Sequence, residues 1–186
     1  MKIDKTQNVS LLLRAILILA MLTLAVILRV APHPWNFTPI GAMALFSGAM
    51  VRDRRMAFLL AMVAMLAGDL FIGFNKLSPL VYASFALSVL IGRFLQENRA
   101  ISRIAGATLL GSVQFFVVTN LGVWAFLGNY PHTKAGLLAC YIAGVPFFWN
   151  TLGSDAVYVA LFFGGFALAE RLVPGLREPA GLRNGS

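Results

Sequence analysis

A cluster of polar side chains interrupts a long apolar run near the end of the chain, over residues 144–158, GVPFFWNTLGSDAVY. Its members are Asn150, Thr151, Ser154, Asp155 and Tyr158. On a helix, Thr151, Asp155 and Tyr158 follow one another at i, i+4 and i+7, so their polar atoms share one face. A carboxylate in so apolar a run is costly unless it faces a partner, a cavity or a ligand. This pattern makes Asp155 the leading candidate for a binding residue.

The same residues do not complete a catalytic motif. Two acids within apolar runs, Asp69 and Asp155, are typical of membrane aspartyl proteases, but their contexts here are LAGD and LGSD, without the GxGD pattern. Ser154 has no GxSG-type context and no histidine on a partner helix. The chain contains no Walker A sequence, and its single cysteine excludes an internal disulfide or a cysteine metal cluster. We therefore expect a protein that is not an enzyme and has no cofactor of its own.

Composition places these residues in a membrane protein. Of the 186 residues, 59% are hydrophobic and 12% are charged, and the charges fall between long uncharged runs. This pattern predicts an all-α protein with several transmembrane helices. The formal charge of +8 does not indicate nucleic-acid binding, because the basic residues flank apolar runs and form no face with stacking aromatics.

The apolar runs predict one domain of six transmembrane helices over residues 1–170, followed by a flexible polar tail over 171–186. The expected crossings are residues 11–28, 40–51, 56–74, 80–95, 104–124 and 147–168. The second run is too short for a straight crossing, so we expect it to be tilted or set in a thinned bilayer. Because Pro146 should break a helix, residues 135–143 are predicted to form a short surface or re-entrant helix before the sixth crossing.

The basic residues then predict the orientation. With six crossings, twelve of the 15 Lys and Arg residues lie on the side of both termini. The other side carries Arg29, Lys76 and Lys134. The positive-inside rule therefore predicts cytoplasmic N- and C-termini in the cytoplasmic (inner) membrane, with the lipid bilayer as the first partner.

In this orientation, polar and aromatic side chains from several elements meet at the outer side. We expect them to line an outward-facing ligand pocket, since several elements contribute to it. The candidates are Trp35, Asn36, Asp69, Leu80, Tyr82, Asn120, Trp124, Tyr130, Asn150, Thr151 and Asp155. An alternative stays open, in which Asp69 and Asp155 only cap backbone groups and hold the bundle together.

Four segments carry a family resemblance. They are PHPWNFTPIGAMALFSGA, AGDLFIGF, TNLGVW and YPHTKAGLLACYIAGVPFFWNTLGSD. In order and spacing, over roughly residues 10–170, they resemble the substrate-binding (S) components of energy-coupling-factor vitamin transporters, and most closely the solitary cobalamin-handling BtuM-like branch. The resemblance implies a six-helix protein that captures a vitamin from outside.

The resemblance also implies partners, namely a transmembrane coupling subunit and two ATPases. Such partners usually dock on small residues of the first helices. Here Ala15, Ala20 and Ala25 are spaced by five, not in the AxxxA pattern of partnered S components. This departure favours a solitary transporter or an unusual partner.

The implied ligand is cobalamin (vitamin B12), yet one expected residue differs. Cobalamin-handling relatives are expected to offer a cysteine to cobalt near the start of the fourth helix, where this chain has Leu80, and Cys140 is its only thiol. Cobalamin would then be held by shape and hydrogen bonds, or by His33 or His132 as cobalt ligand. The alternatives are an S component for another vitamin and a non-transporting membrane scaffold.

Overall fold

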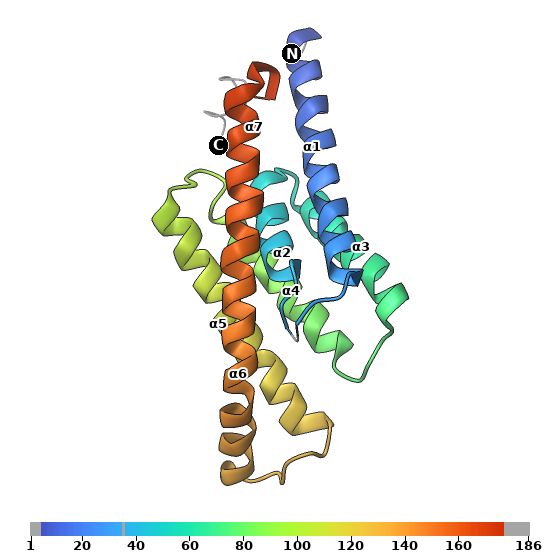
Figure 1. Ribbon diagram of the computed structural model, residues 1–186, viewed down its shortest axis with the longest axis vertical. Coiled ribbons are helices and arrows are strands. Elements are labelled where there is room, and N and C mark those ends of the chain that lie inside the picture. Colours follow the sequence, from blue (N-terminus) through green and yellow to red (C-terminus); the bar gives the residue numbers. More distant parts are fainter. Residues whose placement is uncertain (1–4, 35, 177–186) are drawn as a thin grey trace.

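A computed structural model describes residues 5–34 and 36–176, with side chains from residue 8 onward. All regular elements in these ranges are helical, which confirms the predicted all-α class (Figure 1). The helices are α1 (Lys5–Val30), α2 (Ile40–Met50), α3 (Arg54–Ile72), α4 (Ser78–Arg93), α5 (Ile101–Phe126), α6 (Lys134–Val159) and α7 (Gly165–Leu172). A π-helical turn, η1 (Ala160–Gly164), joins α6 to α7, and a 3-10 turn, η2 (Pro174–Leu176), follows α7.

Four helical segments are long and apolar enough to cross a membrane: α1 from Asn8, α3, α5, and the rod from α6 through α7. The other two apolar helices, α2 and α4, have 11 and 16 residues. At about 1.5 Å per residue, α2 spans only about 16 Å, roughly half of a hydrocarbon core of about 30 Å. The six predicted apolar segments are therefore all helical, but two of them are too short for a straight crossing.

The predicted break at Pro146 is wrong. Residues 134–172 form one continuous helical rod, in which α6 runs through Pro146 and contains the expected short helix over 135–143. A proline removes only one backbone donor from a helix. Breaking the helix in apolar surroundings would leave several backbone groups without partners, which costs more. Thr133 caps the start of the rod, where its hydroxyl accepts a hydrogen bond from the Gly136 N–H at 3.1 Å.

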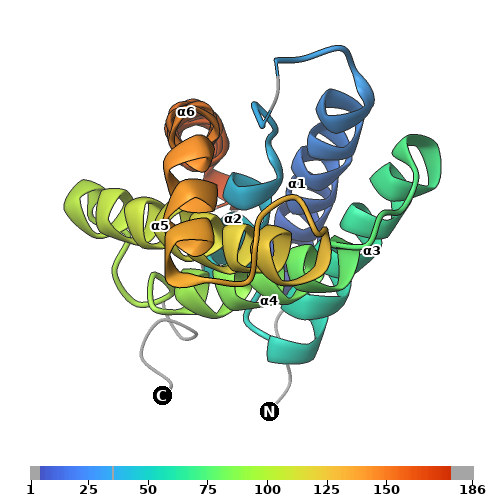
Figure 2. The same ribbon diagram turned by 90° about the horizontal axis from the view of Figure 1, so that it is seen from below.

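Helix α2 lies at the centre of the molecule (Figures 1 and 2). Ten of its 11 residues are buried, and it packs against α1, α3, α4, α5, α6 and η1. Its Phe46 ring is fully buried and meets the Phe163 ring edge-on, at 5.4 Å between centroids. An apolar helix buried on all sides explains why its sequence shows no polar face.

Helices α2 and α4 cross with their backbones in contact. A Cβ added to Gly48 would overlap the Val89 carbonyl oxygen, and one added to Gly92 would overlap the Leu45 carbonyl oxygen. Small residues let membrane helices approach this closely. The crossing therefore depends on glycine at both positions.

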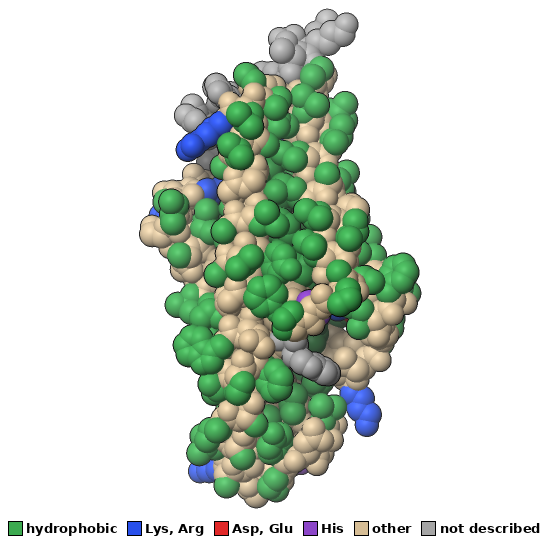
Figure 3. All heavy atoms as spheres, in the orientation of Figure 1, with side chains coloured by type: hydrophobic (Ala, Val, Ile, Leu, Met, Phe, Trp, Pro, Cys, Tyr) green, Lys and Arg blue, Asp and Glu red, His purple; other side chains and the backbone are tan. Residues whose placement is uncertain are grey.

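The start of α1 and the end of α7 lie at the same end of the molecule, and the α5–α6 hairpin projects at the opposite end (Figure 1). On the face shown in Figure 3, hydrophobic side chains cover the middle, while Lys and Arg side chains lie toward the two ends. Of the predicted flexible tail, Arg171–Leu176 completes α7 and η2, and Leu176 is buried. Residues 177–186 lie outside the described residues.

Candidate functional site

Asp155 lies on α6 at the beginning of α2, and its side chain is buried. The Ser112 hydroxyl of α5 donates to Asp155 Oδ2 at 2.7 Å, and the backbone N–H of Ala42 in the first turn of α2 faces the carboxylate. The N-cap residue of α2 is Pro39, which has no side-chain acceptor for these first N–H groups. Asp155 thus takes the role of the N-cap from a different helix, where its negative charge also suits the helix dipole.

Little space remains around this carboxylate. Gly41 lies against it so closely that an added Cβ would overlap Asp155 Oδ1. A cavity of about 10 Å³ adjoins Asp155 and is also lined by Ser88, Thr108 and Gly111. That volume suits about one water molecule. In this conformation, Asp155 closes the centre of the bundle and leaves no room beside α2 for a larger ligand in this cavity.

The segment before α2 reaches into the bundle along α6. Asn36 has a left-handed backbone, with φ of 58°, and its carbonyl accepts a hydrogen bond from the Ser154 hydroxyl at 3.5 Å. The Phe37 ring packs on the Tyr158 ring, with 5.9 Å between centroids. The predicted polar face of α6 therefore does meet another element at Ser154 and Tyr158.

The sequence also predicted Thr151, Asn150 and Trp35 for this part of the site. Thr151 donates to the Phe147 carbonyl of its own helix at 3.0 Å, and Asn150 is exposed. Trp35 lies outside the described residues.

A second group joins α1, α3 and α4. The Arg29 guanidinium forms an ion pair with the buried Asp69, and Gly68 leaves the space in which the Arg29 side chain lies. The Tyr82 side chain faces Asp69. Its hydroxyl and Arg29 Nε are buried with no hydrogen-bond partner within 3.5 Å among the described residues. The sequence pattern predicted Asp69 and Tyr82 but not Arg29, although a basic residue at the same end of a neighbouring crossing was a usable signal.

A third group lies in the α5–α6 hairpin. Trp124 Nε1 donates to the Pro131 carbonyl at 3.0 Å, and His132 Nε2 lies 3.0 Å from the Trp124 carbonyl. Tyr130 is half-buried in the same connection. These contacts stabilise the hairpin loop and do not involve the other two groups.

The histidines predicted as metal ligands lie in different loops. The ring nitrogens of His33 are each 3.0 Å from a backbone carbonyl, those of Pro34 and Arg29. Within the described ranges, no group of three or more His, Cys, Asp or Glu side chains could hold a metal ion. This finding does not test whether one histidine binds the cobalt of cobalamin. That role of His33 or His132 remains a prediction.

Two further candidates pack between helices. Leu80 of α4 fills the space over Gly122 of α5, and Asn120 of α5 lies against Gly144 of α6. The Asn120 amide donates to the Phe116 carbonyl of its own helix at 2.8 Å. Both side chains are thus part of close helix crossings in this conformation.

A larger cavity, of about 1290 Å³, lies at the end of the molecule where α1 begins and α7 ends. Its walls are the first half of α5 and the rod from α6 to α7, and its floor is the end of α2. The charged lining residues are Arg14, Arg52, Glu97, Arg99, Glu170 and Arg171. No sequence pattern predicted this cavity, because its lining residues come from segments far apart in the chain. Thr108 and Val159 line both this cavity and the small one, so Asp155 lies next to its end.

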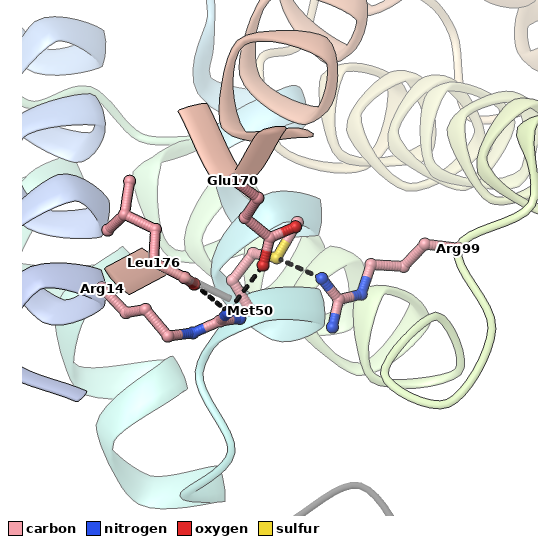
Figure 4. Close-up of polar contacts among 5 residues, drawn as sticks. All are labelled: Arg14, Met50, Arg99, Glu170 and Leu176. Carbon is pink, nitrogen blue, oxygen red and sulfur yellow. Dashed lines mark hydrogen bonds and ion pairs between the residues drawn. The ribbon is translucent and has the colours of Figure 1, made fainter. Parts of the chain in front are cut away.

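Arg14 marks one edge of the larger cavity. Its Nη1 donates to Glu170 Oε1 at 2.6 Å and to the Leu176 carbonyl at 2.7 Å, as Figure 4 shows. The guanidinium carbon also lies 5.2 Å from the centre of the Phe166 ring, a cation–π distance. Arg14 therefore joins α1 to α7 and η2.

Comparison with known proteins identifies the family of this chain but indicates no activity. No curated protein and no solved structure matches the chain. A family model described as "Family of unknown function (DUF6580)" matches residues 9–176, a range that extends from the first turns of α1 to the end of η2. The chain therefore belongs to this family of unknown function, DUF6580.

Proposed function

We propose that the protein takes up a vitamin across the cytoplasmic membrane and binds it from the outer side. Cobalamin is the first candidate, and another vitamin is the alternative. The observation that carries the proposal is the buried half-length helix α2 beside Asp155, which is preceded by irregular chain over residues 31–34 and 36–39. The family resemblance noted in the sequence supports the same function.

The physical argument starts from the backbone. Irregular chain at membrane depth is tolerated only where it is buried in protein or lines a water-filled cavity. In transporters, such interrupted helices mark the substrate site, because their free backbone groups and helix ends can bind a ligand. Here the polar groups at the interruption include Asn36, Ser112, Ser154 and Asp155. Their acceptors suit the amide donors of a vitamin such as cobalamin.

The proposal includes six crossings with cytoplasmic termini. In this proposal, α2 and the chain before it form the second crossing, a tilted α4 forms the fourth, and the positive-inside rule gives the orientation. In this orientation the Arg29–Asp69 ion pair lies at the outer side and the 1290 Å³ cavity opens to the cytoplasmic side. Outer capture then requires residues 31–39 to move away from Ser154 and Asp155.

Binding and uptake are tested separately. Detergent-purified protein should bind cobalamin in calorimetry and carry the corrin absorption in its visible spectrum. Asp155→Asn should weaken binding at least about tenfold, which corresponds to loss of one hydrogen bond to a buried group. Gly106→Ala, at a position with open space around the glycine, serves as the control that retains binding. Absence of binding to cobalamin and to every other tested vitamin would overturn the proposal.

Uptake into vesicles decides the partners. Vesicles that contain only this protein should accumulate labelled cobalamin if it works alone. If accumulation appears only after addition of an energy-coupling-factor transmembrane subunit with its ATPases, the protein is a partnered S component.

A second candidate function is a non-transporting membrane scaffold. It is favoured by one observation, that Asp69 and Asp155 are both paired within the bundle. This candidate predicts that Asp69→Asn and Asp155→Asn lower thermal stability and leave vitamin uptake by the folded protein unchanged. Growth of a vitamin auxotroph that depends on this gene would contradict it.

A further inference from the structure

The 1290 Å³ cavity combines a charged mouth with apolar walls. We propose that it holds an acidic phospholipid from the leaflet at that end of the molecule. The phosphate would lie at the arginines of the mouth, and the acyl chains would lie between α5 and the α6–α7 rod. The mouth of this site lies at the end of α2, whereas the proposed uptake function rests on the residues around the beginning of α2.

The mouth has the charge that an anionic headgroup requires. Four arginines and two glutamates line the cavity, which leaves the lining positively charged. One glutamate, Glu170, is already bound by Arg14 at 2.6 Å. Arg99 reaches in from the opposite side, with its Nη1 3.4 Å from the Met50 sulfur (Figure 4). A guanidinium offers a planar pair of donors that matches phosphate oxygens.

The walls have the chemistry of acyl chains. Their residues include Ile104 and Leu109 on α5, and Leu152, Ala160 and Phe163 on the α6–α7 rod. Leu109 is 51% exposed, and the helix on which it lies is apolar enough to cross a membrane. Apolar walls at hydrocarbon depth are covered by lipid more favourably than by water. The alanines and Gly164 on the rod keep the groove wide, since longer side chains would fill it.

The volume points to a large amphiphile. Pockets for drug-sized ligands have about 300–1,000 Å³, and this cavity exceeds that range. Away from the mouth, Thr108 is the single polar side chain among the described residues that line the cavity. An amide-rich vitamin would find few partners there, whereas two acyl chains need none. The arginines at the mouth also favour a lipid over a transmembrane helix of a partner protein, which needs no anionic group.

Native mass spectrometry of the detergent-purified full chain tests the headgroup. We expect phosphatidylglycerol to bind at least about tenfold more tightly than phosphatidylcholine with the same chains. At roughly 1 kcal/mol for each arginine near an anionic headgroup, Arg99→Gln with Arg171→Gln should weaken phosphatidylglycerol binding about 25-fold. Arg55→Gln is the matched control, because Arg55 is exposed on α3 and is not among the lining residues. Equal binding of both lipids, or equal loss in the control, would overturn the proposal.

A second variant tests the chains. Ala160→Phe should fill the groove and remove the bound lipid, whereas Ala143→Phe, at an exposed alanine outside the cavity on the same rod, should retain it. Lipid retained by a folded Ala160→Phe protein would place the binding elsewhere and overturn the proposal. If Ala160→Phe does not fold, the arginine pair decides the outcome alone. Displacement of the lipid by soluble glycerol phosphate at equal concentration, or a co-purified protein helix in the groove, would also overturn it.

Discussion

At the scale of single residues, buried charge is paired in this protein with groups from distant parts of the chain. Asp155 accepts a hydrogen bond from Ser112 and faces the first turn of α2, and Asp69 is paired with Arg29. A buried polar group without such partners costs free energy, so these contacts stabilise the bundle whatever else they do. The Asp69 and Asp155 carboxylates therefore have a structural role in addition to any role in ligand binding.

Removal of the Asp155 carboxylate should destabilise the protein in a graded way. Asp155→Ala leaves the Ser112 hydroxyl without this acceptor and the start of α2 without a facing carboxylate, and we expect a loss of about 2–4 kcal/mol in unfolding free energy. Asp155→Asn retains one acceptor oxygen and should lose about half as much. Chemical unfolding in detergent measures both values. Equal stability of wild type and Asp155→Ala would contradict the capping role.

Gly41 offers a steric test of the same contact. Gly41→Ala places a methyl group where Asp155 Oδ1 lies, so either the carboxylate or α2 must move, and we expect a loss of at least about 2 kcal/mol. Gly153→Ala on α6 is the matched control. Its added methyl meets open space and should stabilise the helix by up to about 1 kcal/mol. Similar melting temperatures for the two variants would show that the contact is loose.

Among the helices, two have lengths that differ from simple expectations. Helix α6 is longer than its proline suggests, and α2 is shorter than a membrane crossing requires. Helix α6 continues through Pro146, because a helix in apolar surroundings keeps its remaining backbone bonds. Helix α2 stops after 11 residues, although its neighbours are longer. Its stability comes from burial on all sides and from close contact with α4, since it is too short to be stable alone.

Gly48→Ala tests the contact between α2 and α4. The added methyl would overlap the Val89 carbonyl oxygen, which belongs to the backbone and cannot rotate away. The two helices would have to separate, with an expected loss of about 3 kcal/mol or failure to fold. Thermal unfolding monitored by circular dichroism is the measurement. A variant as stable as wild type would mean that α2 and α4 can shift apart freely.

Pro146→Ala tests the continuous rod. Alanine restores the N–H that can donate to the Ile142 carbonyl, so we expect the fold to remain and the unfolding free energy to rise by about 1 kcal/mol. Thermal unfolding in detergent measures the change. A large loss of stability would indicate that the proline ring has a packing role of its own.

At the scale of the whole molecule, the shape agrees with a protein that crosses a membrane. The beginning of α1 and the end of α7 lie at one end, and the α5–α6 hairpin lies at the other (Figure 1). Four segments are long enough to cross, and the short α2 and α4 decide whether the number of crossings is four or six.

Single-cysteine labelling tests the six-crossing topology. In a Cys140→Ala background, Lys76→Cys in the exposed α3–α4 connection should react with an impermeant maleimide added to intact cells. Arg55→Cys at the other end should react only after the membrane is opened. Labelling of both positions from the same side would contradict six crossings.

The helical class, the six apolar segments and the asymmetry of the basic residues could all be predicted from the amino-acid sequence. These features depend on local hydropathy and on counts of charge, which need no knowledge of neighbouring helices. The sequence also indicated that Asp69 and Asp155 need partners, because the cost of burying a carboxylate is general.

The identity of the groups that pair with Asp69 and Asp155 follows from the way the helices pack in three dimensions. Ser112 and Arg29 are 43 and 40 positions away from their acids, so no local pattern connects them. The larger cavity is likewise formed by α5 diverging from the α6–α7 rod, and its lining residues are unremarkable in sequence. Pro146 shows the same limit, since a proline breaks a helix or lies within it according to the packing around it. Helix positions follow from local composition, whereas contacts and cavities follow from how the helices cross.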